Sequence, residues 1–199
     1  MLKKIVIIDY GIGNYISVAS AFEKLNCKVT LTNNFEKINN ADAMVLPGVG
    51  TFPSAVKNLK KNNIFKKIKK IIEKGKPTLG ICLGMQLLAN HSEEIEKTSG
   101  LSIIPGKIQY NELNQTHVGW YKIDVKNKQS KFYPLNNEYF YFQHSCSFKG
   151  SEKYKVAKLS NQLKIASIIQ KNNTIGVQFH PEKSQEAGIK FLKTFIKDI

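Results

Sequence analysis

The sequence predicts an α/β fold with a mostly parallel central sheet flanked by helices and a β-rich second half. An uninterrupted apolar run over residues 4–9, ending in an acid, is typical of a central strand buried on both faces. Further short strand-like runs at 29–32, 43–46 and 78–81 are separated by helical patterns. Beyond residue 100, short β-like runs with turns between them dominate until a closing amphipathic helix from Ala187 onward. These β-like runs lie at 107–110, 120–125, 139–143, 154–159, 163–169 and 174–179.

Length and composition are those of one globular domain. The chain has 199 residues, enough to bury a substantial core, and its 42% apolar and 23% charged fractions are ordinary. The sequence contains no internal repeat and no low-complexity linker. We therefore predict a single domain spanning residues 1–199.

The cysteines and the hydropathy pattern predict a cytoplasmic protein. Cys27, Cys82 and Cys146 are odd in number and widely spaced, which is typical of free thiols in a reducing compartment. The first apolar run ends at Asp9, too early for a signal peptide, and no segment approaches the length of a membrane span. We expect no membrane partner.

The net charge of +15 is the unusual global property of the chain. All 30 basic residues are lysines, and specific recognition of bases and phosphates relies heavily on arginine. The composition therefore favours a lysine bias spread over the whole surface and no nucleic-acid partner, with attraction to an acidic partner as the alternative. Residues 57–76 carry nine lysines interleaved with isoleucines at helical spacing, which predicts one amphipathic helix with a solvated basic face.

Two glycine-containing loops follow predicted strands. The loop over residues 10–14 precedes a helix marked by Val18, Phe22 and Leu25, but the third glycine of a dinucleotide-binding motif would fall at Ile16. It is better interpreted as lining a pocket at the carboxyl edge of the sheet. In the second loop, Pro-Gly-Val-Gly-Thr-Phe-Pro at 47–53, backbone amides can point at an anion, although a plain strand-to-helix turn explains this pattern equally well.

Cys82 occupies the position that would make it a nucleophile. It lies between a short buried strand and a helix starting at Leu83, with Gly80 and Gly84 two residues away on either side. This pattern has the form of a nucleophile elbow, a tight turn in which larger side chains would clash with strand and helix. The first turn of the helix favours thiolate over thiol at Cys82.

His180 and Glu182 form the second chemical motif. A strand ends at His180 because Pro181 follows, so the imidazole should lie at a strand end, where α/β active sites form. Glu182 can turn back and accept a hydrogen bond from the ring. A cysteine at an elbow, a histidine and an orienting acid are the parts of a Cys-His-Glu triad.

The other candidate residues carry weaker signals. Cys27 precedes a strand and is expected to be a small buried apolar residue. Cys146 and His180 could suggest a metal site, but no second cysteine or carboxylate stands at ligand spacing, so we predict none. His91 is expected to end a helix as a surface or capping residue.

Four motifs together give the chain a resemblance to a known family. The elbow Gly-Ile-Cys-Leu-Gly-Met-Gln and the triad-like His-Pro-Glu resemble the class I glutamine amidotransferases. The motifs Ile-Asp-Tyr-Gly-Ile-Gly-Asn at 8–14, Leu-Pro-Gly-Val-Gly-Thr-Phe at 46–52 and His-Pro-Glu-Lys-Ser at 180–184 narrow this to the glutaminase subunits of imidazole glycerol phosphate synthases. The resemblance covers essentially the whole chain and implies a class I glutamine amidotransferase-like fold.

The resemblance implies a reaction, a partner and roles for particular residues. Glutamine would be hydrolysed to glutamate and ammonia without a cofactor or metal. The ammonia would pass to a (β/α)8 synthase subunit that forms a heterodimer with this chain and makes imidazole glycerol phosphate and AICAR in histidine biosynthesis. The implied catalytic residues are Cys82, His180 and Glu182. The implied oxyanion and glutamine-binding residues are Gly48, Val49, Gly50, Leu83, Gln86, His144 and Ser145. The implied residues at the partner interface, near the entry of ammonia, are Asn14, Tyr141 and Lys183. In the family, the partner reorients the oxyanion loop, which couples glutaminase activity to ligand binding by the synthase.

Two segments depart from the family pattern and leave alternatives open. Residues 116–121 read Thr-His-Val-Gly-Trp-Tyr where the family usually has Pro-His-Met-Gly-Trp-Asn, and Cys146-Ser147 replaces an aromatic pair. The first alternative is a paralogous glutaminase subunit that feeds ammonia to a related synthase for amidino groups on surface sugars. A stand-alone cysteine hydrolase would lack Glu182 and the glycine loop, and a catalytically silent regulatory subunit would not need all three triad residues.

Overall fold

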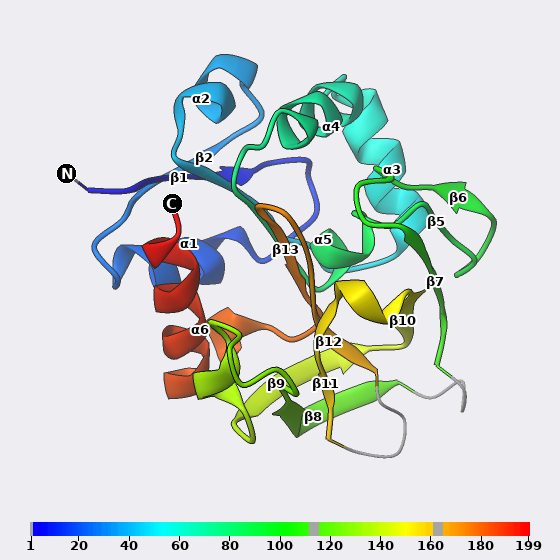
Figure 1. Cartoon of the computed structure of the whole chain (residues 1–199). Coiled ribbons are helices and arrows are strands. Elements are labelled where there is room, and N and C mark those ends of the chain that lie inside the picture. Colours follow the sequence, from blue (N-terminus) through cyan, green and yellow to red (C-terminus); the bar gives the residue numbers. More distant parts are fainter. Residues whose placement is uncertain (1, 112–115, 161–164) are drawn as a thin grey trace.

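The computed structural model describes residues 2–111, 116–160 and 165–199 and contains two sheets in these ranges (Figure 1). In order across the large sheet, the strands are β2 (Lys28–Thr32), β1 (Lys4–Ile8), β3 (Ala43–Leu46), β4 (Thr78–Ile81), β13 (Thr174–Val177), β12 (Ala166–Lys171), β11 (Lys155–Leu159), β8 (His117–Asp124) and β9 (Tyr139–His144). Those of the smaller sheet are β10 (Cys146–Gly150), β7 (Gly106–Tyr110), β5 (His91–Ser92) and β6 (Thr98–Ser99). The helices are α1 (Tyr15–Glu23), α2 (Phe35–Asn40), α3 (Phe52–Lys61), α4 (Phe65–Glu73), α5 (Leu83–Gln86) and α6 (Gln185–Lys197), with short 3-10 turns η1 (Tyr133–Leu135), η2 (Glu152–Tyr154) and η3 (Pro181–Lys183).

The large sheet is mixed, and its parallel part carries the predicted site. Strands β2, β1, β3, β4 and β13 run parallel to one another, whereas β12, β11, β8 and β9 continue the sheet in antiparallel pairs. The predicted α/β class with a flanked central sheet is confirmed. The carboxyl ends of β1, β3, β4 and β13 meet at one edge, so the loops that follow them are brought together.

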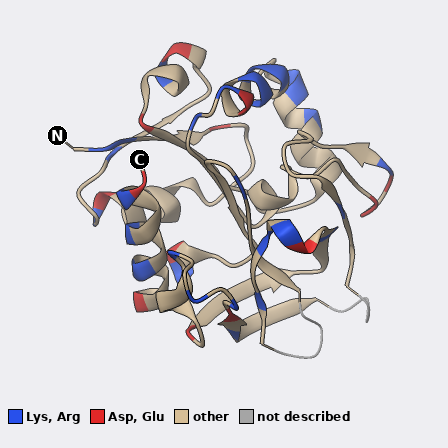
Figure 2. Cartoon of the chain, viewed as in Figure 1, with Lys and Arg blue, Asp and Glu red and all other residues tan. Residues whose placement is uncertain are grey.

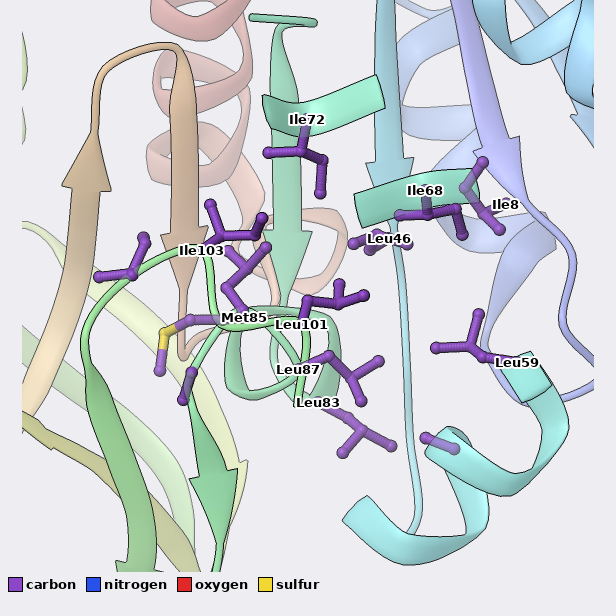
Figure 3. Close-up of a cluster of buried hydrophobic side chains, with 14 of the residues drawn as sticks. Ile8, Leu46, Leu59, Ile68, Ile72, Leu83, Met85, Leu87, Leu101 and Ile103 are labelled. Carbon is purple, nitrogen blue, oxygen red and sulfur yellow. The ribbon is translucent and has the colours of Figure 1, made fainter. Parts of the chain in front are cut away.

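Helices cover both faces of the parallel strands because the side chains of each strand alternate between the faces. Val6 and Ile8 of β1 belong to the cluster to which α2, α3 and α4 contribute. Figure 3 shows Ile8 on the same side of the sheet as Leu59 of α3 and Ile68 of α4. Ile5 and Ile7 face the opposite cluster, to which α1 and α6 contribute. These strand residues are at most 4% exposed, as expected for a strand buried on both faces.

The predicted helix over residues 57–76 is divided into α3 and α4. Asn63 adopts a left-handed conformation with φ 55°. Its amide donates to the carbonyl of Lys60, and the Ile64 amide donates to Leu59, a pattern that ends α3 as a Schellman motif. The expectation of one continuous helix is therefore wrong, because asparagine accommodates the αL turn and the apolar stripe resumes on α4. Figure 2 shows lysines along both helices, on the outer side of the molecule.

Several predicted elements differ in extent from those observed. The helix after Cys82 is only the single turn α5. Strand β10 was not among the predicted runs, and His91 lies in β5 instead of ending a helix. Of the predicted run 163–169, residues 163–164 lie outside the described residues, and the strand begins at Ala166. Among the described residues, no helix has the length and apolar character needed to cross a membrane.

Candidate active site

Cys82 lies at a strained turn between β4 and α5. Its backbone has φ 52° and ψ −109°, a conformation that is costly for a residue with a side chain and is typical of functional turns. The turn is held by the Cys82 amide, which donates to the carbonyl of Val177 at 2.7 Å. The predicted nucleophile elbow is thus present in the backbone geometry.

The two glycines of the elbow have no room for a side chain. A Cβ on Gly80 would lie 2.6 Å from the carbonyl oxygen of Gly84, and a Cβ on Gly84 would lie 1.8 Å from that of Leu46. The backbone of α5 therefore packs directly against the backbones of β3 and β4, with no side chain between them. This close approach presses the turn against the sheet and holds Cys82 at the sheet edge.

Strand β13 brings the histidine to the same edge. It pairs in parallel with β4, and Val177 lies opposite Ile81, so the residues that follow both strands leave the sheet together. The amide of His180 donates to the carbonyl of Tyr141 at 2.9 Å, which anchors this segment to β9. Residues almost a hundred positions apart thereby become neighbours in space.

His180 and Glu182 form a buried pair. Nδ1 of His180 lies 2.8 Å from Oε1 of Glu182, and the two side chains are 3% and 2% exposed. Burial alone would lower the pKa of His180, but its hydrogen bonds with Cys82 and Glu182 outweigh this effect and raise the pKa to about 10. With Nδ1 facing the carboxylate, Nε2 is the ring nitrogen available to the sulfur.

Cys82 and His180 open into one cavity at the sheet edge. The cavity is lined by Val49, Gly50, Cys82, Leu83, Gln86, Glu94, Thr116, Gln143, His144, Ser145, Cys146 and His180. Most of the residues predicted to bind glutamine or an oxyanion thus lie together. Gly48 lies outside this lining: a Cβ there would meet the Tyr10 hydroxyl at 2.6 Å and Leu83 at 2.9 Å, so this glycine permits close packing beneath the loop.

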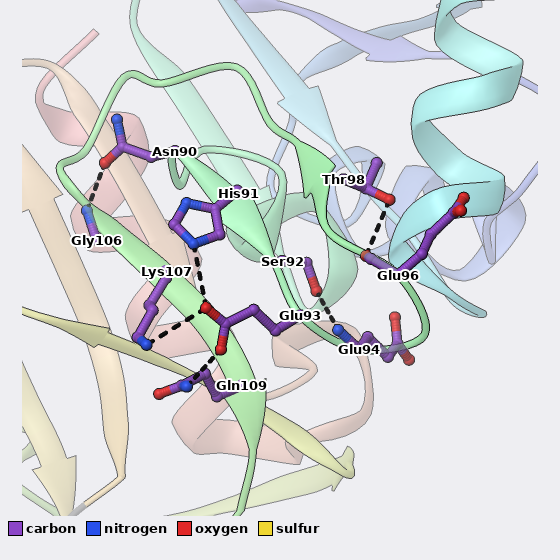
Figure 4. A network of polar contacts seen from close by, with 10 residues as sticks. All are labelled: Asn90, His91, Ser92, Glu93, Glu94, Glu96, Thr98, Gly106, Lys107 and Gln109. Atoms are coloured by element: carbon purple, nitrogen blue, oxygen red, sulfur yellow. Dashed lines mark hydrogen bonds and ion pairs between the residues drawn. The ribbon is translucent and has the colours of Figure 1, made fainter.

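Glu94 was missed by the sequence analysis. It follows β5, lines the cavity, and accepts a hydrogen bond from the amide of Phe52 at 2.7 Å. Its neighbour Glu93 points to β7, where it contacts Lys107 and Gln109 (Figure 4). The Glu-Glu pair in an exposed polar stretch gave no signal by itself, because only the smaller sheet determines which of the two residues lines the cavity.

Two further side chains of the cavity have defined hydrogen-bonding roles. Gln86 donates through Nε2 to the carbonyl of Cys146 at 3.0 Å and to Oε1 of Gln178 at 3.4 Å. His144 contacts the same carbonyl through Nδ1 at 3.0 Å, and burial lowers its pKa to about 4. A neutral His144 that donates through Nδ1 keeps Nε2 as an acceptor, and this atom is buried without a partner in the described structure.

Of the three residues predicted at the partner interface, Tyr141 and Lys183 lie next to His180. The Nζ atom of Lys183 lies 5.5 Å from the centroid of the Tyr141 ring, and that ring lies 6.4 Å from the ring of His180. Asn14 directly precedes α1, which packs against η3, the turn that contains Lys183. The ring of Trp120 lies 6.0 Å from that of Tyr141, and Trp120 is 43% exposed.

Cys27 and His91 lie outside the lining of this cavity. Cys27 is 7% exposed in the core beneath α1, which confirms the expected buried residue. Nε2 of His91, on the smaller sheet, lies 3.4 Å from Oε1 of Glu93. In the described part of the chain, no group of three or more His, Cys, Asp or Glu side chains is arranged to hold a metal ion.

A strained cysteine elbow beside a buried His-Glu pair, at the edge of an α/β sheet, defines the class to which the chain belongs. Residues 6–199 match the family model of glutamine amidotransferase class-I. The chain belongs to this family. Solved structures agree in fold: a chain of PurLQS from Thermotoga maritima has a TM-score of 0.80 at 19% identity, covering 100% of this chain and 99% of that one. A crystal structure of a glutamine amidotransferase has a TM-score of 0.76 at 16% identity, covering 96% and 97%.

Closer relatives place the chain within the class. It is 43% identical over 202 residues to imidazole glycerol phosphate synthase subunit HisH of Lactococcus lactis, with 100% of both chains covered. It is also 43% identical over 196 residues to the HisH subunit of Caldanaerobacter subterraneus, with 95% of both chains covered. Identities of this size over the whole length show that the chain is a member of the HisH family.

Proposed function

We propose that the chain is the glutaminase subunit of an imidazole glycerol phosphate synthase. It hydrolyses L-glutamine to glutamate and ammonia, and passes the ammonia to a (β/α)8 synthase subunit that makes imidazole glycerol phosphate and AICAR in histidine biosynthesis. The observation that carries this proposal is the elbow cysteine, which shares one cavity with a buried histidine and its carboxylate partner.

The chemistry follows from the position of each group. Sγ of Cys82, as thiolate, attacks the side-chain amide carbon of glutamine and forms a tetrahedral intermediate. His180, protonated at Nε2, gives its proton to the departing ammonia, which leaves a thioester on Cys82. His180 then takes a proton from water, whose oxygen attacks the thioester and releases glutamate. Glu182 holds the imidazole through Nδ1 and stabilises its positive charge.

The cavity offers complementary contacts for the substrate. Backbone amides at Leu83 and in the Val49–Gly50 turn are the proposed donors to the oxyanion. The carboxylate of Glu94 suits the α-ammonium group of glutamine, and Oε1 of Gln86 suits a donor on the substrate. The Val49 side chain is 42% exposed, which fits a loop that the synthase subunit can contact and reorient.

Glutamate release by the purified chain tests the proposal. We expect weak hydrolysis by the chain alone and strong hydrolysis when the synthase subunit and its nucleotide ligand are present. Cys82→Ala should abolish both, whereas Cys27→Ala, a matched change at a buried thiol outside the cavity, should not. Full activity in Cys82→Ala would exclude the proposed nucleophile, and strong activity unaffected by the synthase would exclude the coupling.

A growth test separates the two proposed destinations of the ammonia. We expect the chain, expressed with its cognate synthase, to restore growth without histidine in a bacterium lacking its own HisH. A pair that produces ammonia in vitro but does not restore growth would favour the paralogous role in amidino-sugar synthesis.

A further inference from the structure

Gln178 is a buried polar residue that contacts the sulfur of Cys82. It directly follows β13, is 0% exposed, and its Nε2 lies 3.8 Å from Sγ of Cys82. Its backbone amide donates to the carbonyl of Ser167 at 3.0 Å, which anchors the residue to β12. Because Val177 and Ile81 are paired in register, Gln178 and Cys82 are the first residues beyond two adjacent strands.

A chain of hydrogen bonds determines which atom of the Gln178 amide faces the sulfur. The carbonyl of Cys146 can only accept, so it orients Gln86 with Nε2 toward it, at 3.0 Å. The second hydrogen of the same nitrogen points at Gln178, 3.4 Å away, and requires an acceptor there. Oε1 of Gln178 therefore faces Gln86, and its NH2 group is left to face Cys82.

We infer that Gln178 is a positioning residue for the reactive thiolate, which it stabilises by donating a hydrogen bond to Sγ, and that Gln86 holds it in the donating orientation. This inference rests on the proposed role of Cys82 as nucleophile. A thiolate accepts a hydrogen bond more strongly than a thiol does, so a fixed donor shifts the equilibrium toward the ionised form. The donor comes from the side of β13, while His180 supplies the proton for the leaving group.

Several other titratable and polar groups also surround the sulfur of Cys82. His180 hydrogen-bonds to the sulfur, and Glu182 lies behind His180. Burial raises the pKa of the Tyr10 hydroxyl, next to β1, so this group stays neutral toward Cys82. Glu94, His144 and Cys146 line the same cavity. The carbonyl of Gln143 lies 3.7 Å from Sγ and accepts from the thiol, so it favours the protonated form. Variants must therefore leave these groups unchanged.

The experiment measures the pH dependence of alkylation at Cys82 in the full chain, without glutamine. The rate with iodoacetamide, followed by mass spectrometry of the Cys82 peptide, reports the thiolate fraction. Gln178→Met keeps the approximate side-chain volume and removes the hydrogen-bond donor to Sγ. We therefore expect the midpoint of the alkylation profile to rise by about one pH unit. Below both midpoints, this rise corresponds to a tenfold smaller thiolate fraction in the variant. Gln178→Glu places a carboxylate beside the sulfur and should raise the midpoint further. Gln170→Met, the same substitution on the neighbouring strand β12, is the matched control and should leave the midpoint unchanged.

The Gln86 variant tests the orienting step and remains informative if the Gln178 variants do not fold. Gln86→Met leaves Gln178 in place without its anchor, and we expect a rise in the midpoint smaller than that of Gln178→Met. Combining the two substitutions should add nothing to Gln178→Met alone. The inference is overturned if the alkylation midpoint of folded Gln178→Met equals that of wild type. If the Gln178 variants do not fold, an unchanged midpoint in Gln86→Met overturns it. Slower alkylation at every pH, with no shift in the midpoint, also overturns it. Loss of glutamine hydrolysis in Cys82→Ala shows separately whether the proposed function holds.

Discussion

Replacing Gly84 by alanine tests how closely the turn at Cys82 packs against the large sheet. The added Cβ would lie 1.8 Å from the carbonyl oxygen and 2.6 Å from the carbonyl carbon of Leu46, where real contacts are not shorter than 3.0 Å. Both atoms belong to the backbone of β3, so no side chain can rotate away. Helix α5 and strand β3 must separate by roughly an ångström.

The cost of this separation can be estimated from the packing. Overpacking a buried site lowers the free energy of unfolding by about 1–3 kcal/mol, and a clash with backbone atoms belongs at the upper end of this range. For a chain of 199 residues, a loss of about 3 kcal/mol lowers the melting temperature by roughly 6–12 °C. Because Cys82 moves with α5, and misplacement by an ångström can cost about a hundredfold in rate, glutamine hydrolysis should fall by that order.

Gly75→Ala provides the matched control. Gly75 has φ +90° and nothing within 4 Å of its added Cβ, so the substitution tests backbone strain without a clash. Gly75→Ala should lower the free energy of unfolding by about 1–2 kcal/mol and leave the rate of glutamine hydrolysis unchanged. Differential scanning calorimetry and a glutamate-release assay with the synthase subunit would measure both variants. A Gly84→Ala protein as stable and as active as wild type would refute the reasoning.

Three further predictions concern the charged groups of the site. His180 has a pKa raised from 6.5 to about 10 in the folded protein, so its stabilising contribution is complete below pH 6.5 and disappears as the pH rises toward 10. His180→Gln should therefore flatten the fall in melting temperature between these two pH values, and an unaltered slope would contradict the buried imidazolium. Glu182→Gln should lower kcat by about 10²–10⁴-fold with little change in KM, which steady-state assays with the synthase subunit would measure. Glu94→Gln should raise KM for glutamine by roughly 10–100-fold, whereas Glu93→Gln should not, and equal effects would show that the cavity does not bind the ammonium group at Glu94.

The turn at Cys82 and the contact between His180 and Glu182 could be predicted from the sequence because each resides in a short motif. Gly80, Cys82 and Gly84 encode the elbow within five consecutive residues, and the glycines are required by backbone contacts that any such turn makes. The pair His180 and Glu182 is equally local, since the acid is two residues from the ring that it contacts. The apolar runs likewise located β1, β3 and β4 because buried parallel strands need continuous apolar sequence.

The arrangement of these motifs was decided by tertiary structure. Strand β13 could have paired anywhere in a sheet of this kind, and only its insertion beside β4 brings Gln178 and His180 to Cys82. Glu94 and Gln178 were missed for the same reason: a polar residue acquires its role from the neighbours that pairing supplies, and those neighbours are distant in sequence. The division of the lysine-rich stretch into α3 and α4 depended on Asn63, whose αL turn leaves the helical periodicity almost intact.

The sequence by itself thus determined the α/β class, the cysteine turn with its glycines, and the histidine with its acid, because each depends on interactions within a few residues. Tertiary structure alone decided which strands are neighbours, which of two adjacent glutamates faces the cavity, and which amide atom of Gln178 faces the sulfur. The physical reason is that hydrogen bonds and burial act over a few ångströms in space, and the strand order of the sheet determines which distant residues come within that range.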